Sequence, residues 1–148
     1  EEQISEGKIY IGTNRIRVEY ETPSKILIIL DQHKAMYYNY DLEEDEFFNP
    51  KDTAAWFFSD IFNDPKFFFN KKTILEQKDN YISLQKKGFN NQDEEYNIVV
   101  YFENNPIILR KIILSFEDNE LVISLFNHKF NEIYEKNFFK LINPNFFN

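Results

Sequence analysis

The sequence contains no cysteine and only 3 glycines among its 148 residues. The lack of cysteine excludes disulfides, thiol nucleophiles and cysteine-based zinc sites. So few glycines cannot build a phosphate-binding loop, and no P-loop, GxGxxG or GxSxG motif is present. No run reaches the roughly 18 apolar residues of a membrane-spanning helix, and no signal peptide is recognisable. We therefore expect no nucleotide enzyme and no transmembrane segment.

Basic residues are also scarce. The chain has 17 Lys and Arg against 25 Asp and Glu, which gives a net charge of −8. Binding to a nucleic-acid backbone depends on clustered Lys and Arg, and no basic stripe is present. We expect no nucleic-acid partner.

The titratable residues form no recognisable catalytic or metal-binding pattern. His33 and His128 are far apart and belong to no ligand motif, so each is expected in a turn or at the surface. No two of the acids stand out as a glycosidase pair. The acidic run at 41–46 lacks the glycine and spacing of a calcium loop, which favours a solvated loop; its members are Asp41, Glu43, Glu44, Asp45 and Glu46. We assign no catalytic residue and no metal site, and we predict that the protein is not an enzyme.

Aromatic residues, in contrast, are abundant: 17 Phe, 9 Tyr and 1 Trp make up 18% of the chain. Each such ring buries roughly 150–250 Å². The length fits a single domain over residues 1–148 and allows a real core. The rings either fill that core or also line a ligand cavity, and composition leaves both alternatives open.

The first forty residues read as two β-hairpins. Ile16, Val18 and Tyr20 alternate with charged residues, which is typical of a half-buried strand. A break at 12–14 pairs this strand with the KIYI strand before it. KILIIL at 25–30 and AMYYNY at 35–40 form the second hairpin. Short polar connections indicate an antiparallel meander.

The sheet pattern is then interrupted by a helical segment. Thr53 is expected to cap a helix that ends near Phe62, with Trp56, Phe57 and Ile61 on one stripe. Asp64-Pro65 predicts a second start, with a short helical turn over 67–69. Five further strands follow, separated by Asn, Asp and Pro turns; they are predicted at 72–78, 81–87, 96–103, 107–116 and 121–126. The pattern predicts an α+β domain with a helical insertion between two groups of antiparallel strands.

Four segments follow one another in a recognisable order: GKIYI at 7–11, NRIRVEY at 14–20, IILDQHKAMYY at 28–38 and FENNPIILRK at 102–111. Together they resemble strands of the outer-membrane lipoprotein carrier family, LolA, whose patterns include GRFRWEY and FxDxPLELRK. Thr53 before a short apolar helix, VISLFN at 122–127 and FFKLINP at 138–144 extend the resemblance over nearly the whole chain.

The resemblance implies a fold and a function. The fold is a curved antiparallel β-sheet, an incomplete β-barrel or half-pipe, with short helices covering its concave apolar face. The function is that of a periplasmic carrier without cofactor. It accepts acylated lipoproteins from an inner-membrane ABC transporter complex and passes them to an outer-membrane acceptor.

Two departures from the family pattern bear on this function. Where the family carries an Arg-Pro pair linked to lid closure, the chain has Gly12 and Thr13. The alternative is therefore a non-transporting lipoprotein-sensing or regulatory module of the same fold. The family's N-terminal helix and first strand also have no counterpart before Glu6, so either this sequence is truncated or the N-terminal lid is missing. In the second case we expect a more open half-pipe whose exposed apolar face favours self-association.

Strand alternation and the resemblance together predict the lipid-binding residues. Ile16, Val18 and Tyr20 share one face by alternation. The match to the family's inward aromatic residues selects Met36, Tyr38 and Tyr40, opposite Ile28 and Leu30. The complete predicted set is Ile16, Val18, Tyr20, Ile28, Leu30, Met36, Tyr38, Tyr40, Trp56, Phe57, Ile61, Ile112, Leu114, Ile123 and Leu125. The alternative is that these side chains fill an ordinary core without a cavity.

Overall fold

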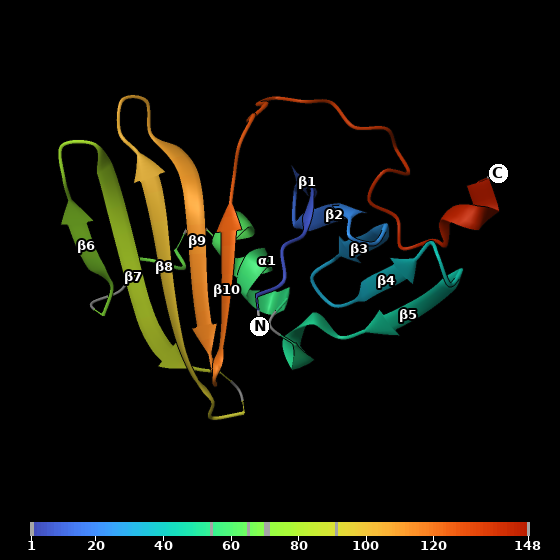
Figure 1. The fold of residues 1–148 in the computed structure, drawn as a ribbon, viewed down its shortest axis with the longest axis horizontal. Coiled ribbons are helices and arrows are strands. Elements are labelled where there is room, and N and C mark those ends of the chain that lie inside the picture. Colours follow the sequence, from blue (N-terminus) through green and yellow to red (C-terminus); the bar gives the residue numbers. More distant parts are fainter. Residues whose placement is uncertain (1, 54, 65, 70–71, 91, 148) are drawn as a thin grey trace. The chain divides into compact units, whose positions relative to one another are not determined.

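The computed structural model describes residues 2–53, 55–64, 66–69, 72–90 and 92–147 (Figure 1). Within these residues, ten strands form two antiparallel sheets of five strands, accompanied by one α-helix and two short 3-10 helices. The antiparallel α+β character of the prediction is confirmed. The described residues group into two compact units: unit 1 holds residues 2–64 and 133–147, and unit 2 holds residues 66–132. The assignment of residues 1–148 to one domain stays a prediction.

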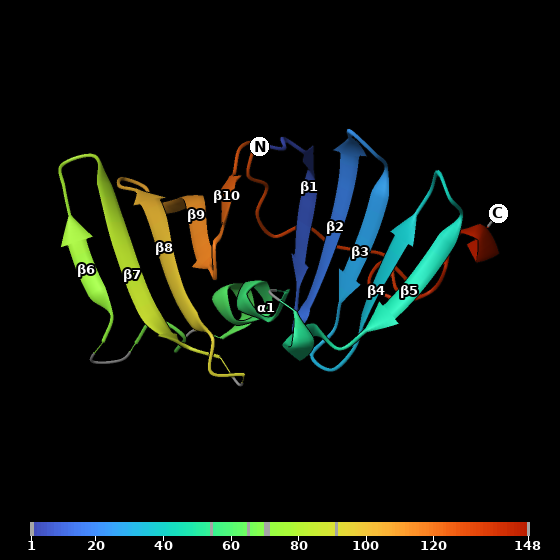
Figure 2. The same cartoon turned by 60° about the horizontal axis from the view of Figure 1, so that its bottom comes forward.

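Unit 1 contains sheet 1, a meander in which each strand pairs with the next along the chain (Figure 2). Its strands are β1 (Glu6–Gly12), β2 (Arg15–Thr22), β3 (Ile26–Leu30), β4 (Ala35–Asn39) and β5 (Glu44–Phe48). Both predicted hairpins are confirmed. In the β1–β2 turn Asn14 adopts a φ of 56°, which asparagine tolerates well. Its N–H donates a hydrogen bond of 3.2 Å to Oδ1 of Asn63, at the end of the helix.

Strand β5 lies where the acidic run predicts a solvated loop. Residues 41–43 form the turn, but Glu44, Asp45 and Glu46 pair with β4. Their side chains are exposed, as expected. An outer strand needs only backbone pairing to one neighbour, and charged side chains there discourage pairing with another molecule. The loop prediction is therefore wrong for the second half of the run.

A short helix covers one face of sheet 1, which we call the helix face. Helix α1 (Ala55–Asn63) begins after Thr53, whose Oγ1 accepts a hydrogen bond of 3.1 Å from the N–H of Ala55. The predicted cap is thus confirmed. A 3-10 helix, η1 (Pro50–Asp52), precedes α1. Residues on the helix face pack together with one side of α1; the sheet contributes Ile9, Ile11, Ile16, Val18, Ile28, Leu30, Ala35 and Phe48, and α1 contributes Ala55, Phe58 and Phe62.

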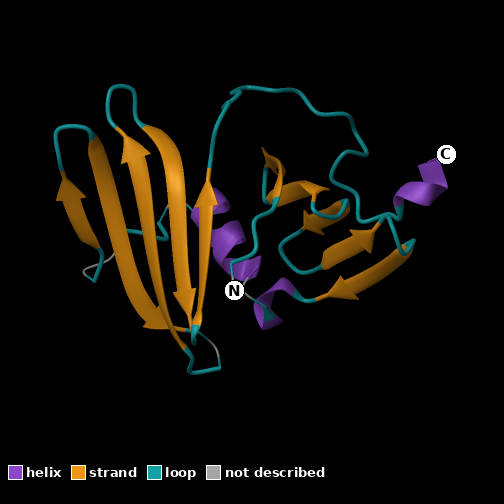
Figure 3. Ribbon diagram, in the orientation of Figure 1, coloured by secondary structure: helices purple, strands orange, loops and turns teal. Residues whose placement is uncertain are grey.

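The other face of sheet 1 is covered by residues 133–147, which we call the C-terminal segment. Apart from a 3-10 helix, η2 (Pro144–Phe147), this segment contains no regular structure (Figure 3). Leu141 packs against a buried cluster of Leu27, Ile29, Met36 and Tyr38. Arg17 donates a hydrogen bond of 2.9 Å to the carbonyl oxygen of Phe138, and its guanidinium lies 4.4 Å from the centre of that ring. Sheet 1 is therefore covered on both faces.

Unit 2 contains sheet 2, a second meander of consecutive strands. Its strands are β6 (Ile74–Gln77), β7 (Tyr81–Phe89), β8 (Glu95–Glu103), β9 (Ile108–Phe116) and β10 (Asn119–Ser124). All five predicted strands are confirmed. One face, the buried face, carries buried side chains; they are Tyr96, Ile98, Val100, Ile112 and Leu114. The alternate residues form the opposite face, which we call the outer face.

The segment before β6 is a turn and not a helix. The N–H of Phe69 donates a hydrogen bond of 3.0 Å to the carbonyl oxygen of Lys66, and this closes a single turn. Pro65, which the sequence marks as a helix start, lies outside the described residues. Lys86 of β7 donates a hydrogen bond of 2.9 Å to the carbonyl oxygen of Phe67, and its ammonium lies 3.7 Å from the centre of that ring.

The strand pairing differs from the expectation of a single continuous sheet. Among the described residues, every pairing joins strands that are consecutive in the chain, and none joins sheet 1 to sheet 2. The described residues between β5 and β6 form η1, α1 and the turn at 66–68, and none of them continues the ladder of sheet 1. The helical insertion thus divides the predicted sheet into two.

Candidate functional site

Five of the predicted lipid-binding residues lie together on the helix face of sheet 1. Across β2 and β3, Ile16 pairs with Leu30 and Val18 pairs with Ile28, so all four share a face with Tyr20. Ile16 and Leu30 are buried, at 1% and 3% exposure, whereas Val18, Tyr20 and Ile28 are half-buried. Burial raises the pKa of the Tyr20 phenol above its ordinary value of 10.0, because the ionised form is poorly solvated there. This face is apolar, and the exposure of its side chains increases from the buried Ile16 and Leu30 to the half-buried Val18, Tyr20 and Ile28.

Three further predicted residues lie on the opposite face. Met36 pairs with Ile29 and Tyr38 with Leu27, whereas Ile28 pairs with Tyr37. The expected placement of Met36 and Tyr38 opposite Leu30 and Ile28 is wrong by one residue. A one-residue shift moves every side chain of a strand to the other face. Because β3 is apolar on both faces, alternation alone could not detect the shift.

These three residues pack under the C-terminal segment. Met36 and Tyr38 belong to the cluster against which Leu141 and Tyr40 pack. The rings of Tyr38 and Tyr40 meet edge to face with centres 4.8 Å apart. Burial is the main cause that raises the pKa of the Tyr40 phenol. The environment is apolar, but it is filled by the protein's own C-terminal segment.

In the helix, the predicted stripe differs from the stripe that meets the sheet. Ala55, Phe58 and Phe62 pack on the helix face, because a spacing of three and four residues brings them to one side of α1. The predicted Trp56, Phe57 and Ile61 do not belong to that packed cluster. Phe57 is nevertheless fully buried, and its ring stacks on Trp56 with centres 3.8 Å apart.

In unit 2 the predicted residues share the buried face. Ile112 pairs with Val100 on one side and with Ile123 on the other, and Leu114 pairs with Ile98. Leu125 follows β10, where its N–H donates a hydrogen bond of 2.8 Å to the carbonyl oxygen of Arg110. Lipid binding by any of these residues stays a prediction.

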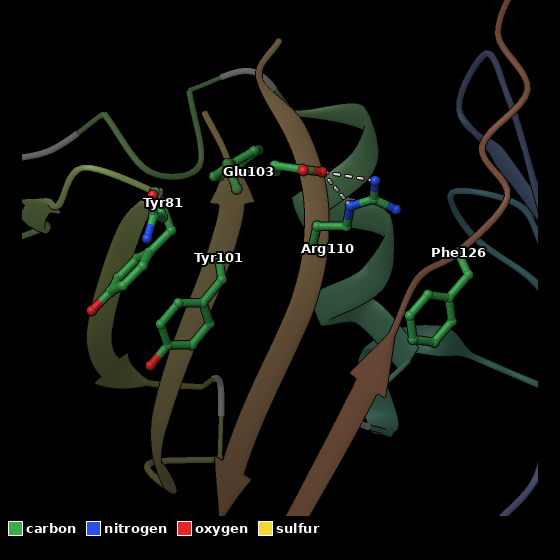
Figure 4. Close-up of a pocket in the computed structure, with 7 residues that line it drawn as sticks. Tyr81, Tyr101, Glu103, Arg110 and Phe126 are labelled. Atoms are coloured by element: carbon green, nitrogen blue, oxygen red, sulfur yellow. Dashed lines mark hydrogen bonds and ion pairs between the residues drawn. The ribbon is translucent and has the colours of Figure 1, made fainter. Parts of the chain in front are cut away.

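The outer face of sheet 2 holds an open pocket of about 530 Å³ that sequence analysis missed. It is lined by Asn80, Tyr81, Tyr101, Phe102, Glu103, Arg110 and Phe126. Figure 4 shows the rings of Tyr81 and Tyr101 side by side, and the Glu103 carboxylate directed at Arg110. The ring centres are 5.8 Å apart. Oε2 of Glu103 lies 2.7 Å from Nη2 of Arg110 and 2.8 Å from its Nε.

A β-bulge brings Arg110 into this pocket. Tyr101 pairs with Lys111, but the next residue, Phe102, pairs with Leu109, so Arg110 is the extra residue of β9. A bulge of this kind re-aims a side chain. Here it places Arg110 on the same face as Glu103. The alternation of Tyr81 and Tyr101 with Ile82 and Val100 was readable from sequence, whereas the bulge was not.

The histidines and acids form no metal centre in the part of the chain that the structure describes, where no three potential ligands gather. His33 is exposed near the β3–β4 turn, as predicted. His128 is half-buried, with Nε2 2.7 Å from the carbonyl oxygen of Leu109. No helix among the described residues is long and apolar enough to cross a membrane.

Comparison with protein families gives a match over most of the chain. The model of the family described as outer membrane lipoprotein carrier protein LolA matches residues 1–142. The match includes both sheets, α1 and most of the C-terminal segment. A comparison with curated proteins gave no match.

Proposed function

The chain belongs to the outer-membrane lipoprotein carrier family, LolA, and on that premise we propose that it carries lipoproteins through the periplasm from the inner to the outer membrane. In this proposal the acyl chains are sheltered against the apolar helix face of sheet 1. No enzymatic step is involved. The partners are the acylated lipoproteins, an inner-membrane ABC transporter complex that supplies them and an outer-membrane acceptor.

The observation that carries the proposal is the graded burial of the helix face. Ile16 and Leu30 are sealed beneath Phe58 and Phe62 of α1, and the neighbouring row of Val18 and Ile28 is only half-buried. An acyl chain laid along this row would remove further apolar surface from water, which contributes roughly 0.8 kcal/mol per methylene.

In this proposal α1 is the movable cover of the site. A helix of nine residues has little stability of its own, so it is held mainly by the packing of Phe58 and Phe62 on the sheet. Displacing those rings exchanges one apolar contact for another when an acyl chain enters. The binding energy is thereby partly offset, which lets a carrier release its cargo.

A titration with a fluorescent fatty acid tests the proposal. We expect saturable binding to the folded chain and a loss of at least about tenfold in affinity for Val18→Glu, because a carboxylate on the apolar helix face opposes contact with an apolar ligand. Val122→Glu is the matched control, since Val122 is 46% exposed on β10 and carries no predicted role. Circular dichroism checks that both variants fold. Absence of saturable binding to the folded parent chain would contradict the proposal.

The second candidate is a lipoprotein-sensing or regulatory module without transport. It is favoured by Gly12 and Thr13, which stand where the family has its Arg-Pro pair. An added Cβ at Gly12 would lie 2.7 Å from Cε2 of Phe139, so a larger residue there conflicts with the C-terminal segment. Loading the protein with a purified acylated lipoprotein and adding acceptor separates the two: delivery supports the carrier, and retention together with binding to a regulatory protein supports the sensor.

A further inference from the structure

The pocket on the outer face of sheet 2 is built from four separate segments. Tyr81 begins β7 and Asn80 precedes it, Tyr101 and Glu103 come from the end of β8, and Arg110 comes from the bulge in β9. The hydrogen bond from the N–H of Leu125 to the carbonyl oxygen of Arg110 holds the chain that carries Phe126 beside it. A volume of about 530 Å³ lies within the range of small-molecule sites.

The charged groups of this pocket limit the class of ligand that it can bind. Glu103 and Arg110 neutralise each other at 2.7 Å, so a charged ligand would have to compete with an existing ion pair. Both groups remain about half exposed, at 48% and 40% for the side chains, and keep unused hydrogen-bonding positions. The phenol hydroxyls and the Asn80 amide add further donors and acceptors.

The aromatic rings supply the apolar part of the same surface. Tyr81 and Tyr101 are half-buried and meet at an interplanar angle of 61°, so their rings form an angled platform (Figure 4). Phe126 is 74% exposed at the other side of Arg110. Exposed aromatic rings next to an ion pair without net charge suit a ligand that has an apolar face and a rim of hydroxyls.

We propose that this pocket binds a neutral saccharide. The C–H face of a pyranose ring stacks on the ring of Tyr101 and meets the angled ring of Tyr81 at its edge, while its hydroxyls donate to Glu103 and accept from Arg110. Tyr101 lies on the face of sheet 2 opposite to Val100 and Ile112, because successive residues of a strand alternate. The saccharide site is therefore distinct from the predicted lipid-binding residues and does not rest on the carrier function.

Nuclear magnetic resonance titration of the full chain tests this inference, with chitotetraose and maltotetraose as probes. We expect saturable shifts of the amides of Tyr81, Tyr101 and Arg110 for at least one probe. Tetramethylammonium is the contrasting probe, because a cation also binds to aromatic faces. No saturable shift with either saccharide up to about 10 mM, or saturation of these amides by tetramethylammonium alone, would overturn the inference.

Variants assign the binding to the pocket. Tyr101→Ala is expected to weaken saccharide binding by about tenfold or more, and Tyr101→Phe, which keeps the ring, to weaken it less. Phe89→Ala is the matched control, because Phe89 is an exposed aromatic residue of β7 outside the pocket. Unchanged saccharide affinity in Tyr101→Ala, or an equal loss in Phe89→Ala, would place the site elsewhere and refute the proposal.

Discussion

Sheets 1 and 2 have the same topology but differ in how their faces are covered. Each is a meander of five antiparallel strands. In sheet 1, α1 packs on one face and the C-terminal segment packs on the other. In sheet 2, the outer face carries the open pocket and half-buried side chains such as Val99 and Tyr101.

The difference in covering is visible in the burial of the central strands, β3 and β8. In β3, Leu27 and Ile29 are buried on one face while Leu30 is buried on the other. In β8, buried Ile98 and Val100 alternate with half-buried Val99 and Tyr101. Strands buried on both faces lose alternation, whereas strands with one open face keep it. The comparison teaches that a run such as ILIIL indicates a second covering segment, which can lie far away in the sequence.

The largest expected effect is a difference in unfolding free energy between substitutions in the two central strands, β3 and β8. Ile29→Ala should lower the free energy of unfolding by about 3 kcal/mol, because it leaves a cavity between β3 and the C-terminal segment. Val99→Ala, at a half-buried site of β8, should cost about 1 kcal/mol or less. Urea unfolding followed by circular dichroism measures both. Equal losses would mean that the two central strands are covered alike.

A smaller effect concerns the two cationic contacts. Arg17→Ala should cost about 1–2 kcal/mol, because it removes the hydrogen bond to Phe138 and the contact with its ring. Lys86→Ala removes the corresponding contacts to Phe67. In hydrogen exchange, we expect faster exchange in residues 134–142 for the first variant and in residues 66–69 for the second. Unaltered exchange in 134–142 would show that Arg17 does not hold the C-terminal segment.

The two glycines with an aromatic ring over them give a third comparison. A Cβ added at Gly12 would lie 2.7 Å from the Phe139 ring, and one at Gly88 would lie 2.7 Å from the Tyr96 hydroxyl. Gly12→Ala should lower the free energy of unfolding by about 1 kcal/mol and weaken the packing of the C-terminal segment, since the Phe139 ring must shift. Gly88→Ala should disturb only the neighbouring strand, because Tyr96 is its cross-strand partner. Combining Gly12→Ala with Phe139→Leu should restore part of the loss; a further loss would contradict the contact.

The smallest effect is the pH dependence of the covered sheet. Burial raises the pKa of Tyr20 above 10.0, so the unfolded chain loses this proton before the folded chain does. The stability linked to Tyr20 is therefore fully present below about pH 10 and is lost as the pH rises through the folded pKa. Tyr20→Phe should show a smaller decline in unfolding free energy between about pH 9 and pH 11. Parallel curves for parent and variant would contradict this.

Much of the fold was predictable from local patterns. Alternation in β2 and β8 and the turn residues between strands located every strand except β5. That strand escaped because Glu44, Asp45 and Glu46 have low strand propensity, whereas an exposed outer strand depends on backbone pairing. The division into two sheets was also missed, since local sequence does not show which strands share a ladder.

The candidate site was predictable only in part. The grouping of Ile16, Val18 and Tyr20 on one face followed from alternation, and the structure confirms it. The register that places Met36 did not follow from alternation, because both faces of β3 are apolar. The pocket on sheet 2 depends on Arg110, whose direction is set by a bulge that no periodic pattern reveals.

The bond between Arg17 and Phe138 also has a consequence for biosynthesis. It joins residues 121 positions apart, whereas each strand pairing in the described part of the chain joins consecutive strands, which can form hairpins soon after synthesis. While ribosomes are still making the chain, Leu27, Ile29 and Met36 therefore have no cover on their side of the sheet. The growing chain thus exposes an apolar sheet face that holding chaperones can recognise. Ribosome stalling before residue 133 would leave this face exposed and the chain prone to aggregation.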